Sequence, residues 1–125
     1  MTGLEVKSKE MGGVSVVYLK GYLDAHTAPD FEKVLRDLID QDRFCLVVNL
    51  SELHYIASAG VGVFMGFIEE IRSKGGDIKL AEPTEKVFRV FDLLGFHLLY
   101  DICRKEEEAL RKYARSSTSK KRGKP

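Results

Sequence analysis

Residues 46–64 read LVVNLSELHYIASAGVGVF, and this stretch decides the fold because it joins a buried strand to a glycine-rich helix. The apolar run over residues 44–50 is typical of strands covered on both faces, which are usually central and parallel. After a polar break, we predict a helix from near Ser58 to about Lys74, closed by the glycine pair at 75 and 76. The chain is therefore expected to fold around a parallel strand followed by a helix.

Two strands and a helix are predicted before this stretch. Leu4–Met11 alternates apolar and polar residues, Gly12-Gly13 predicts a hairpin turn, and Val14–Leu19 is rich in β-branched residues. We expect these two strands to pair antiparallel. Thr27 and Asp30 resemble a capping box at the start of the helix that follows. The apolar residues of that helix recur at helical spacing: Phe31, Val34, Leu35, Leu38 and Ile39.

The alternation of strand and helix continues after the deciding stretch. Asp77–Ala81 predicts a strand, and Pro83-Thr84 introduces a helix that ends at Gly95. Five residues of this helix are expected to face inward: Val87, Phe88, Val90, Phe91 and Leu94. His97–Ile102 favours a short edge strand, and Lys105–Ala114 favours a charged terminal helix.

The order of these elements, ββαβαβαβα, predicts one α/β domain. We expect a mixed sheet of four to five strands with about four helices, occupying residues 1–115. Residues 116–125, SSTSKKRGKP, are expected to form a disordered basic tail. A solubilising or tethering role for this tail is favoured over specific binding of nucleic acid or anionic lipid.

Composition and charge narrow the class of protein further. The chain has 125 residues, 44% hydrophobic and 31% charged, which fits a single soluble globular domain. No apolar run reaches the roughly 18–20 residues of a membrane span, and no secretory signal is visible. Cys45 and Cys103 lie far apart without metal-ligand spacing and predict no disulfide framework, so a protein of the reducing cytoplasm is expected. The net charge of the chain is +1, and the tail alone carries +4, so the rest of the chain carries −3. Because the folded part is mildly acidic, we expect no direct binding of nucleic acid.

Motifs of catalysis and metal binding are absent from the sequence. His26, His54 and His97 lie far apart and show no metal-ligand spacing. Neither a phosphate-cradling glycine motif nor a G-x-S-x-G elbow occurs. We therefore expect no catalytic residues, no metal site and no cofactor.

The uncharged segment IASAGVGVFMGFI at residues 56–68 places Gly60, Gly62 and Gly66 within the predicted helix. Each glycine costs the helix about 1 kcal/mol relative to alanine. One explanation is close packing of the helix on the sheet. The other is a flat surface that lets a partner protein approach the backbone, and both can hold on opposite faces of the helix.

Ser58, at the head of this helix, also has two interpretations. As an N-cap, its hydroxyl would accept a hydrogen bond from the first turn and contribute about 1 kcal/mol. As a phosphate acceptor, it would add negative charge at the positive end of the helix dipole, which the fold should tolerate. The added charge would then act on whatever protein docks against this surface.

Two segments together resemble the STAS domain of bacterial anti-sigma factor antagonists. GYLDAHTA at residues 21–28 is similar to the family's G-x-L-D-x-x-T-A stretch, and residues 46–64 are similar to its strand-to-helix segment. The glycine pair, the short strand and the VFRVFDLLGF helix at residues 87–96 agree with the same pattern. The resemblance runs from about residue 4 to residue 112 and implies a STAS-like fold.

The resemblance also implies a mechanism, partner switching. In that family, the unphosphorylated antagonist binds an anti-sigma factor that is also a serine kinase, and a sigma factor is thereby freed. Phosphorylation of a serine at the start of the second helix ends binding, and a PP2C-type phosphatase reverses it. Ser58 falls at that serine. The implied partner-binding residues are Asp24, Ala25, His26, Ala57, Ser58, Ala59, Gly60, Val61 and Gly62.

Two positions depart from the family pattern, because Ala57 and Asn49 stand where the family commonly has Asp. One alternative is therefore a non-switching STAS scaffold, or an accessory subunit of a signalling or lipid-transport complex, in which Ser58 is only a cap. Another is a small nucleotide-binding α/β enzyme. A catalyst is expected to show a pocket with convergent polar groups, and a binding module a flat or convex patch around Ser58.

Overall fold

The computed structural model describes the backbone of residues 3–122 and the side chains of residues 3–114. Within this range the chain forms five strands and five helices, one short helix more than the sequence predicted. In chain order they are β1 Leu4–Met11, β2 Val14–Leu23, α1 Ala28–Asp40, β3 Cys45–Ile56, α2 Ser58–Ser73, β4 Asp77–Ala81, α3 Glu85–Leu93, α4 Phe96–Leu99, β5 Ile102–Cys103 and α5 Glu106–Arg122.

The strands form one mixed sheet in the order β1-β2-β3-β4-β5. As predicted, β1 and β2 are antiparallel around the Gly12-Gly13 turn, and β2 to β5 run parallel. The position of β3 in the middle of the sheet confirms the prediction that its apolar run forms a central strand. This strand continues beyond the predicted end at residue 50, and shifts in its register with β2 keep Leu53 and Ile56 buried.

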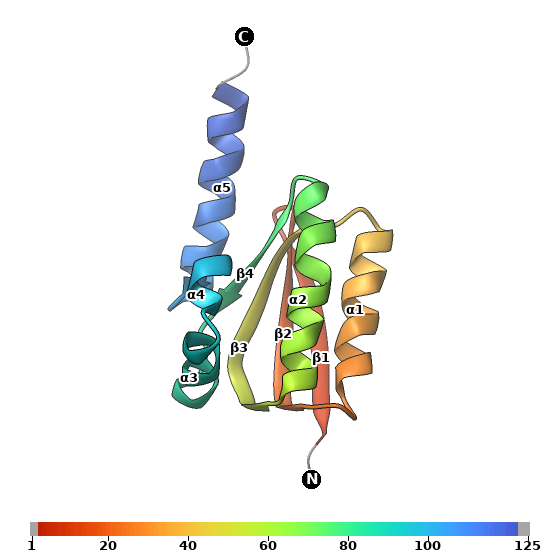
Figure 1. Cartoon of the computed structure of the whole chain (residues 1–125). Helices are drawn as coiled ribbons and strands as arrows, with labels where there is room; N and C mark the ends of the chain where they lie inside the picture. The colour runs from red at the N-terminus through yellow and green to blue at the C-terminus, as the bar shows by residue number, and fades with distance from the viewer. Residues whose placement is uncertain (1–2, 123–125) are drawn as a thin grey trace.

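Helices cover the two faces of the sheet unequally. α1 and α2 lie side by side across one face, whereas α5 extends beyond the end of the sheet (Figure 1). The first four helices and that face form the main core. α5 covers part of the other face through a smaller apolar cluster: Val14, Val16, Val47, Ala81, Cys103 and Ala109.

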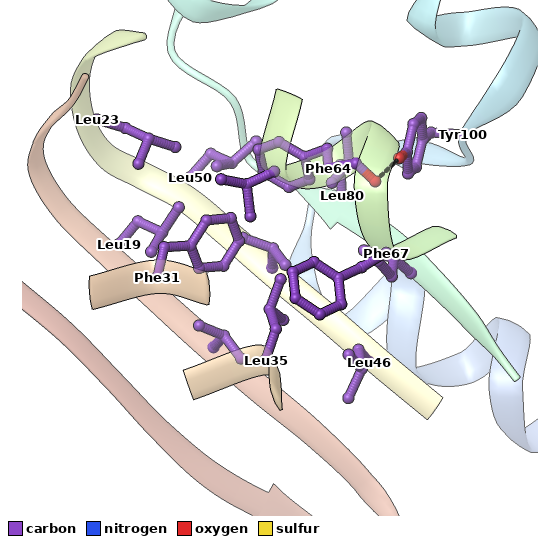
Figure 2. Close-up of a cluster of buried hydrophobic side chains, with 14 of the residues drawn as sticks. Leu19, Leu23, Phe31, Leu35, Leu46, Leu50, Phe64, Phe67, Leu80 and Tyr100 are labelled. Atoms are coloured by element: carbon purple, nitrogen blue, oxygen red, sulfur yellow. Dashed lines mark hydrogen bonds between the residues drawn. The ribbon is translucent and has the colours of Figure 1, made fainter. Parts of the chain in front are cut away.

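Phe64 of α2 lies at the centre of the main core (Figure 2). Its ring contacts Phe31 of α1 at a centroid distance of 5.2 Å and Phe91 of α3 at 5.9 Å. Its backbone carbonyl accepts a hydrogen bond of 2.7 Å from the buried Tyr100 hydroxyl. Edge-to-face ring pairs contribute about 0.5–1.5 kcal/mol each beyond the area they bury. Phe64 therefore ties α2 to the helices on both sides of it.

Polar side chains fasten α5 to the sheet. Asn49, buried on β3, donates a hydrogen bond of 2.8 Å to Glu106, and Tyr18 donates one of 3.1 Å to the other oxygen of that carboxylate. Burial and the neighbouring Glu106 raise the pKa of Tyr18 to about 12. Further along α5, the Tyr113 hydroxyl accepts from the amide of Leu46 at 3.1 Å and donates to the carbonyl of Asp77 at 2.6 Å. Asn49 is thus explained as an anchor for α5.

The region after β4 differs from the prediction. Phe88 and Leu94 were expected to face inward, but their side chains are 40% and 54% exposed. The short edge strand expected at His97–Ile102 forms only as the two residues of β5, Ile102–Cys103, because the chain before it forms the helical turn α4. Phe96 stacks on Phe91 at a centroid distance of 4.7 Å, and a helical turn then places Tyr100 on the same buried side.

Two helix ends also differ from the prediction. The capping box at Thr27 does not form, since its side chain makes no cap bond to α1. Its hydroxyl instead accepts from the amide of Asp24 at 2.9 Å and donates to the carbonyl of Tyr22 at 2.8 Å. α5 runs to Arg122, so the backbone is helical in much of the segment 116–125 for which the sequence predicted disorder. Residues 123–125 of that segment lie outside the described range.

Candidate functional site

Two loops that are far apart in the sequence meet where β2 and β3 end. Leu23 pairs with Ile56 at the last register position of the two strands. The amide of Ala57 then donates a hydrogen bond of 2.9 Å to the carbonyl of Leu23. The predicted partner-binding segments 24–26 and 57–62 are therefore brought together at one edge of the sheet.

The loop at Asp24 is a tightly bonded turn. The carboxylate of Asp24 accepts from the amide of His26 at 2.9 Å and from the amide of Thr27 at 3.2 Å. Together with the Thr27 hydroxyl, it closes the loop before α1 starts. Ala25 and His26 project into solvent at its tip. Asp24 therefore acts as a turn residue, and the exposed tip is the part of this loop that a partner can contact.

Ser58 does not cap α2, contrary to one of its two interpretations. The N-cap position is occupied by Ala57, and no side chain caps this helix. Ser58 is the first helical residue, exposed, and within the described part of the chain its hydroxyl has no hydrogen-bond partner. The amides of Ser58 and Ala59 likewise have no backbone acceptor there, because bonding to Ala57 begins with Gly60 and Val61.

The three glycines of α2 divide between the two explanations. A Cβ atom on Gly60 would lie 2.5 Å from Cγ of Leu23 and 3.1 Å from Cγ1 of Ile56, so this glycine serves close packing. A Cβ atom on Gly62 or Gly66 would meet nothing within 4 Å. These two positions face solvent, so close packing does not require glycine at either of them.

An apolar depression adjoins Ser58. It has a volume of about 220 Å³ and lies between the start of α2 and the end of α3. Its lining residues are Ile56, Ala57, Ser58, Val61, Val90, Leu93 and Leu94. Leu93 is 87% exposed and Leu94 54%. The sequence prediction placed Leu94 inward, which is wrong, and it left Leu93 outside the inward set without assigning it to the site.

Charge is sparse at this end of α2. The first turn of the helix carries no acidic residue, so no side chain of its own offsets the positive end of its dipole. The Asp24 carboxylate on the neighbouring loop is already engaged by two backbone amides. The site thus combines one free hydroxyl, free amide groups and an apolar rim, which suits docking of a protein surface and offers no convergent set of catalytic groups.

Comparison with known proteins decides the family. Residues 5–109 match the STAS domain. The chain belongs to the STAS domain family. The anti-sigma-B factor antagonist of Bacillus subtilis is 33% identical over 91 residues, which are 73% of this chain and 83% of that protein. The anti-sigma F factor antagonist of Paenibacillus polymyxa is 32% identical over 109 residues, 86% and 92% of the two chains.

Solved structures share the fold of this STAS domain. The anti-sigma factor antagonist SpoIIAA in its unphosphorylated form superposes with a TM-score of 0.77 at 24% identity, covering 88% of this chain and 96% of that one. The phosphorylated form of the same Bacillus protein gives a TM-score of 0.68 at 23% identity, covering 88% and 98%. The resemblance stated from the sequence motifs is therefore confirmed, together with the mixed α/β sheet that it implied.

The remaining candidates of the sequence do not converge in this STAS domain. His26 lies in the loop before α1, His54 lies beside the ring of Tyr22, and His97 lies 3.5 Å from a carboxylate oxygen of Asp92. Over the described residues, no three or more His, Cys, Asp or Glu side chains gather in a way that could hold a metal ion. Among the described helices, none is both long and apolar enough to cross a membrane.

Proposed function

We propose that this STAS domain is an anti-sigma factor antagonist that works by partner switching. Unphosphorylated, it binds an anti-sigma factor that is also a serine kinase, and a sigma factor is released in the cytoplasm. Phosphorylation at Ser58 ends this binding, and a PP2C-type phosphatase restores it. The relatives from Bacillus subtilis and Paenibacillus polymyxa, both antagonists of anti-sigma factors, support this class of partner.

The observation that carries the proposal is the free hydroxyl of Ser58 at an uncapped helix start. A serine that caps a helix would have to give up its bond before accepting a phosphate, whereas this hydroxyl is exposed and unbonded within the described residues. Ala59 follows it, so the next position offers no second acceptor. Ser58 is therefore the residue through which a kinase would act at this site.

A phosphate on Ser58 would act on the partner more than on the fold. It adds a charge of about −1.5 to −2 beside the free amides of Ser58 and Ala59, where the helix dipole favours it. A partner that docks over the apolar depression lined by Val61, Leu93 and Leu94 would exclude water from the same charge. The first-turn amides compensate only part of this charge, and burying the remainder against a partner costs several kcal/mol, so we expect affinity to fall by about 100-fold or more.

The test is binding of the purified chain to the anti-sigma factor kinase of the same organism by calorimetry. Ser58→Ala is expected to bind within about twofold of the unmodified protein, and Ser58→Glu to lose binding. Ser8→Glu, an equal charge on exposed β1, is the matched control and should bind normally. Equal binding of Ser58→Ala and Ser58→Glu would refute the switch.

Phosphorylation is tested separately with the kinase and ATP. Fragment-ion mass spectrometry has to locate the phosphate, because the tryptic peptide from Phe44 to Arg72 also contains Ser51 and Tyr55. The Ser58→Ala variant should take up no phosphate in this peptide. A PP2C-type phosphatase should then remove the phosphate and restore binding.

A non-switching scaffold is the second candidate, and Ala57 is the observation that favours it. An acidic residue at this N-cap would cap α2 beside the acceptor, and this chain lacks it. Asn49, the other departure, gives no such support, because its side chain bonds Glu106 of α5. Absence of phosphate on Ser58 in native cells, both growing and stressed, would favour the scaffold.

A further inference from the structure

A second cavity lies away from Ser58, where β4 and β5 end. Its volume is about 540 Å³, within the range of roughly 300–1,000 Å³ typical of small-molecule sites. Its lining residues are Glu82, Pro83, Glu85, Phe88, Ile102, Cys103 and Arg104. None of them lines the depression beside Ser58.

The path of the chain explains why the sheet opens at this point. After β4 the chain passes to α3, whose buried residues belong to the main core. After β5 it passes to α5, which packs on the opposite face. In open α/β sheets, ligands bind in the crevice outside the carboxyl ends of the parallel strands. The cavity occupies that place.

The walls of the cavity are apolar. Phe88 keeps 40% of its surface exposed although the helical spacing of α3 predicted it inward, and it lines this cavity with the half-buried Ile102. Cys103 is buried, and burial raises the pKa of its thiol, so it contributes a neutral surface. These residues form a floor suited to an aromatic or branched aliphatic group.

Charges of opposite sign come from the two connections that border the cavity. Glu82 lies in the segment between β4 and α3, Glu85 is the first residue of α3, and Arg104 follows β5. One oxygen of Glu82 accepts a hydrogen bond of 2.9 Å from the amide of Glu106 and so caps α5. Glu85 is exposed, and among the described side chains its carboxylate bonds only to the exposed Arg89, so a ligand can compete for it.

We propose that this cavity binds a small zwitterion with a large apolar side chain, the chemistry of a free aromatic or branched-chain α-amino acid. The ammonium group pairs with the carboxylates of Glu82 and Glu85, the carboxylate pairs with Arg104, and the side chain packs on Phe88 and Ile102. This pairing uses every charged group of the lining. It is independent of the switch at Ser58.

Three probes that differ by one group test the proposal on the full chain. L-Phenylalanine carries both charges, 2-phenylethylamine lacks the carboxylate, and 3-phenylpropanoate lacks the ammonium. Each is titrated to millimolar concentration while amide shifts are followed by two-dimensional NMR. L-Phenylalanine is expected to give saturable shifts at Phe88, Ile102 and Arg104, and each truncated probe to bind about tenfold or more weakly.

Variants then separate the two ends of the ligand. Arg104→Gln should weaken L-phenylalanine about tenfold and leave 2-phenylethylamine unchanged, because that probe never uses the guanidinium. Glu85→Gln should weaken 2-phenylethylamine and leave 3-phenylpropanoate unchanged. Leu98→Ala, at an exposed position of α4 outside the cavity, is the control and should bind all three as the unmodified chain does.

Two results would overturn the inference. One is the absence of saturable shifts at the cavity with all three probes. The other is L-phenylalanine binding that Arg104→Gln and Glu85→Gln leave unchanged, since the charges would then take no part. Thermal unfolding of Arg104→Gln and Glu85→Gln should match that of the unmodified chain, which shows that a loss of binding does not come from misfolding.

Discussion

Replacing Asn49 by Asp tests how α5 is held on the sheet. Asn49 is only 6% exposed, and its amide donates to Glu106 at 2.8 Å while its oxygen accepts from the amide of Ser51 at 2.9 Å. The substitution keeps the oxygen and the shape of the side chain but turns the donor into a second acceptor. Two carboxylates would then face each other at hydrogen-bonding distance.

The expected loss has two parts. A hydrogen bond to a charged group contributes about 1.5–3 kcal/mol. Without the bond from Asn49, the hydrogen bond from Tyr18 is the remaining described bond between the sheet and the Glu106 carboxylate. Repulsion between like charges adds about 1.4 kcal/mol for each unit by which it raises the pKa of the introduced carboxyl. We expect Asn49→Asp to lower the free energy of unfolding by about 3 kcal/mol at pH 8.

The loss should depend on pH in a defined direction. The introduced carboxyl has a higher pKa in the folded chain than in the unfolded chain, so the folded state binds more protons and stability falls as pH rises. At pH near 4 the protonated group donates to Glu106 as Asn49 did, and the variant should approach the unmodified protein. The gap opens as pH rises through the raised pKa and is complete at pH 8.

Urea unfolding of the single and double variants over this pH range measures the effect. In Asn49→Asp with Glu106→Gln, the new amide can donate to the new carboxylate, so most of the loss should be recovered. A gap below about 0.5 kcal/mol, a gap that does not change with pH, or a double variant no more stable than the single one would refute the reasoning.

Three further predictions concern single contacts. Gly60→Ala should lower the free energy of unfolding by about 1–2 kcal/mol, because the clash with Leu23 exceeds the gain in helix propensity. Gly62→Ala should raise it by up to about 1 kcal/mol, because the added methyl meets no neighbour, and thermal unfolding compares the two variants. Tyr113→Phe should cost about 1–3 kcal/mol and lower hydrogen-exchange protection in α5 more than in α2. Burial opposes ionisation of Asp101, but hydrogen bonds and charges from Lys112 and Lys79 outweigh it and lower its pKa. Its contribution is therefore present above the unfolded pKa of about 4 and lost as pH falls through the folded one, so Asp101→Asn should cost about 0.5–1 kcal/mol near neutral pH and nothing at low pH.

Strand and helix periodicity predicted the elements from β1 to β4 correctly. The hairpin at Gly12-Gly13, the central β3 and the start of α2 at Ser58 all follow from local pattern, and the structure agrees. The prediction is wrong at several positions between Phe88 and Leu99, because tertiary packing decides there which apolar residues are buried, whereas the helix predicted at Lys105–Ala114 is found as α5. Stacking of Phe96 on Phe91 turns an apparent strand into a helical turn, and no periodicity within that segment signals it.

The candidate site was predictable in its residues but not in its detail. Spacing alone brought Ser58 and the glycines into consideration, but it could not distinguish Gly60, which packs against Leu23, from Gly62, which faces solvent. The prediction that Ser58 caps α2 is wrong because the helix begins one residue earlier, with Ala57 at the N-cap directly after β3. Leu93 and Leu94 were missed as part of the rim because their exposure depends on where α3 sits beside α2.

If Ser58 accepts a phosphate, as proposed above, the missing cap of α2 makes the melting temperature a reporter of that modification. A helix that begins without a side-chain acceptor lacks about 1 kcal/mol that a cap supplies, and an anion held by the first-turn amides recovers an amount of this order. For a domain of this size, that difference corresponds to a few degrees. The modified form would then be the more heat-resistant one while being unable to dock, so a simple melting curve, with no partner present, would read the fraction modified.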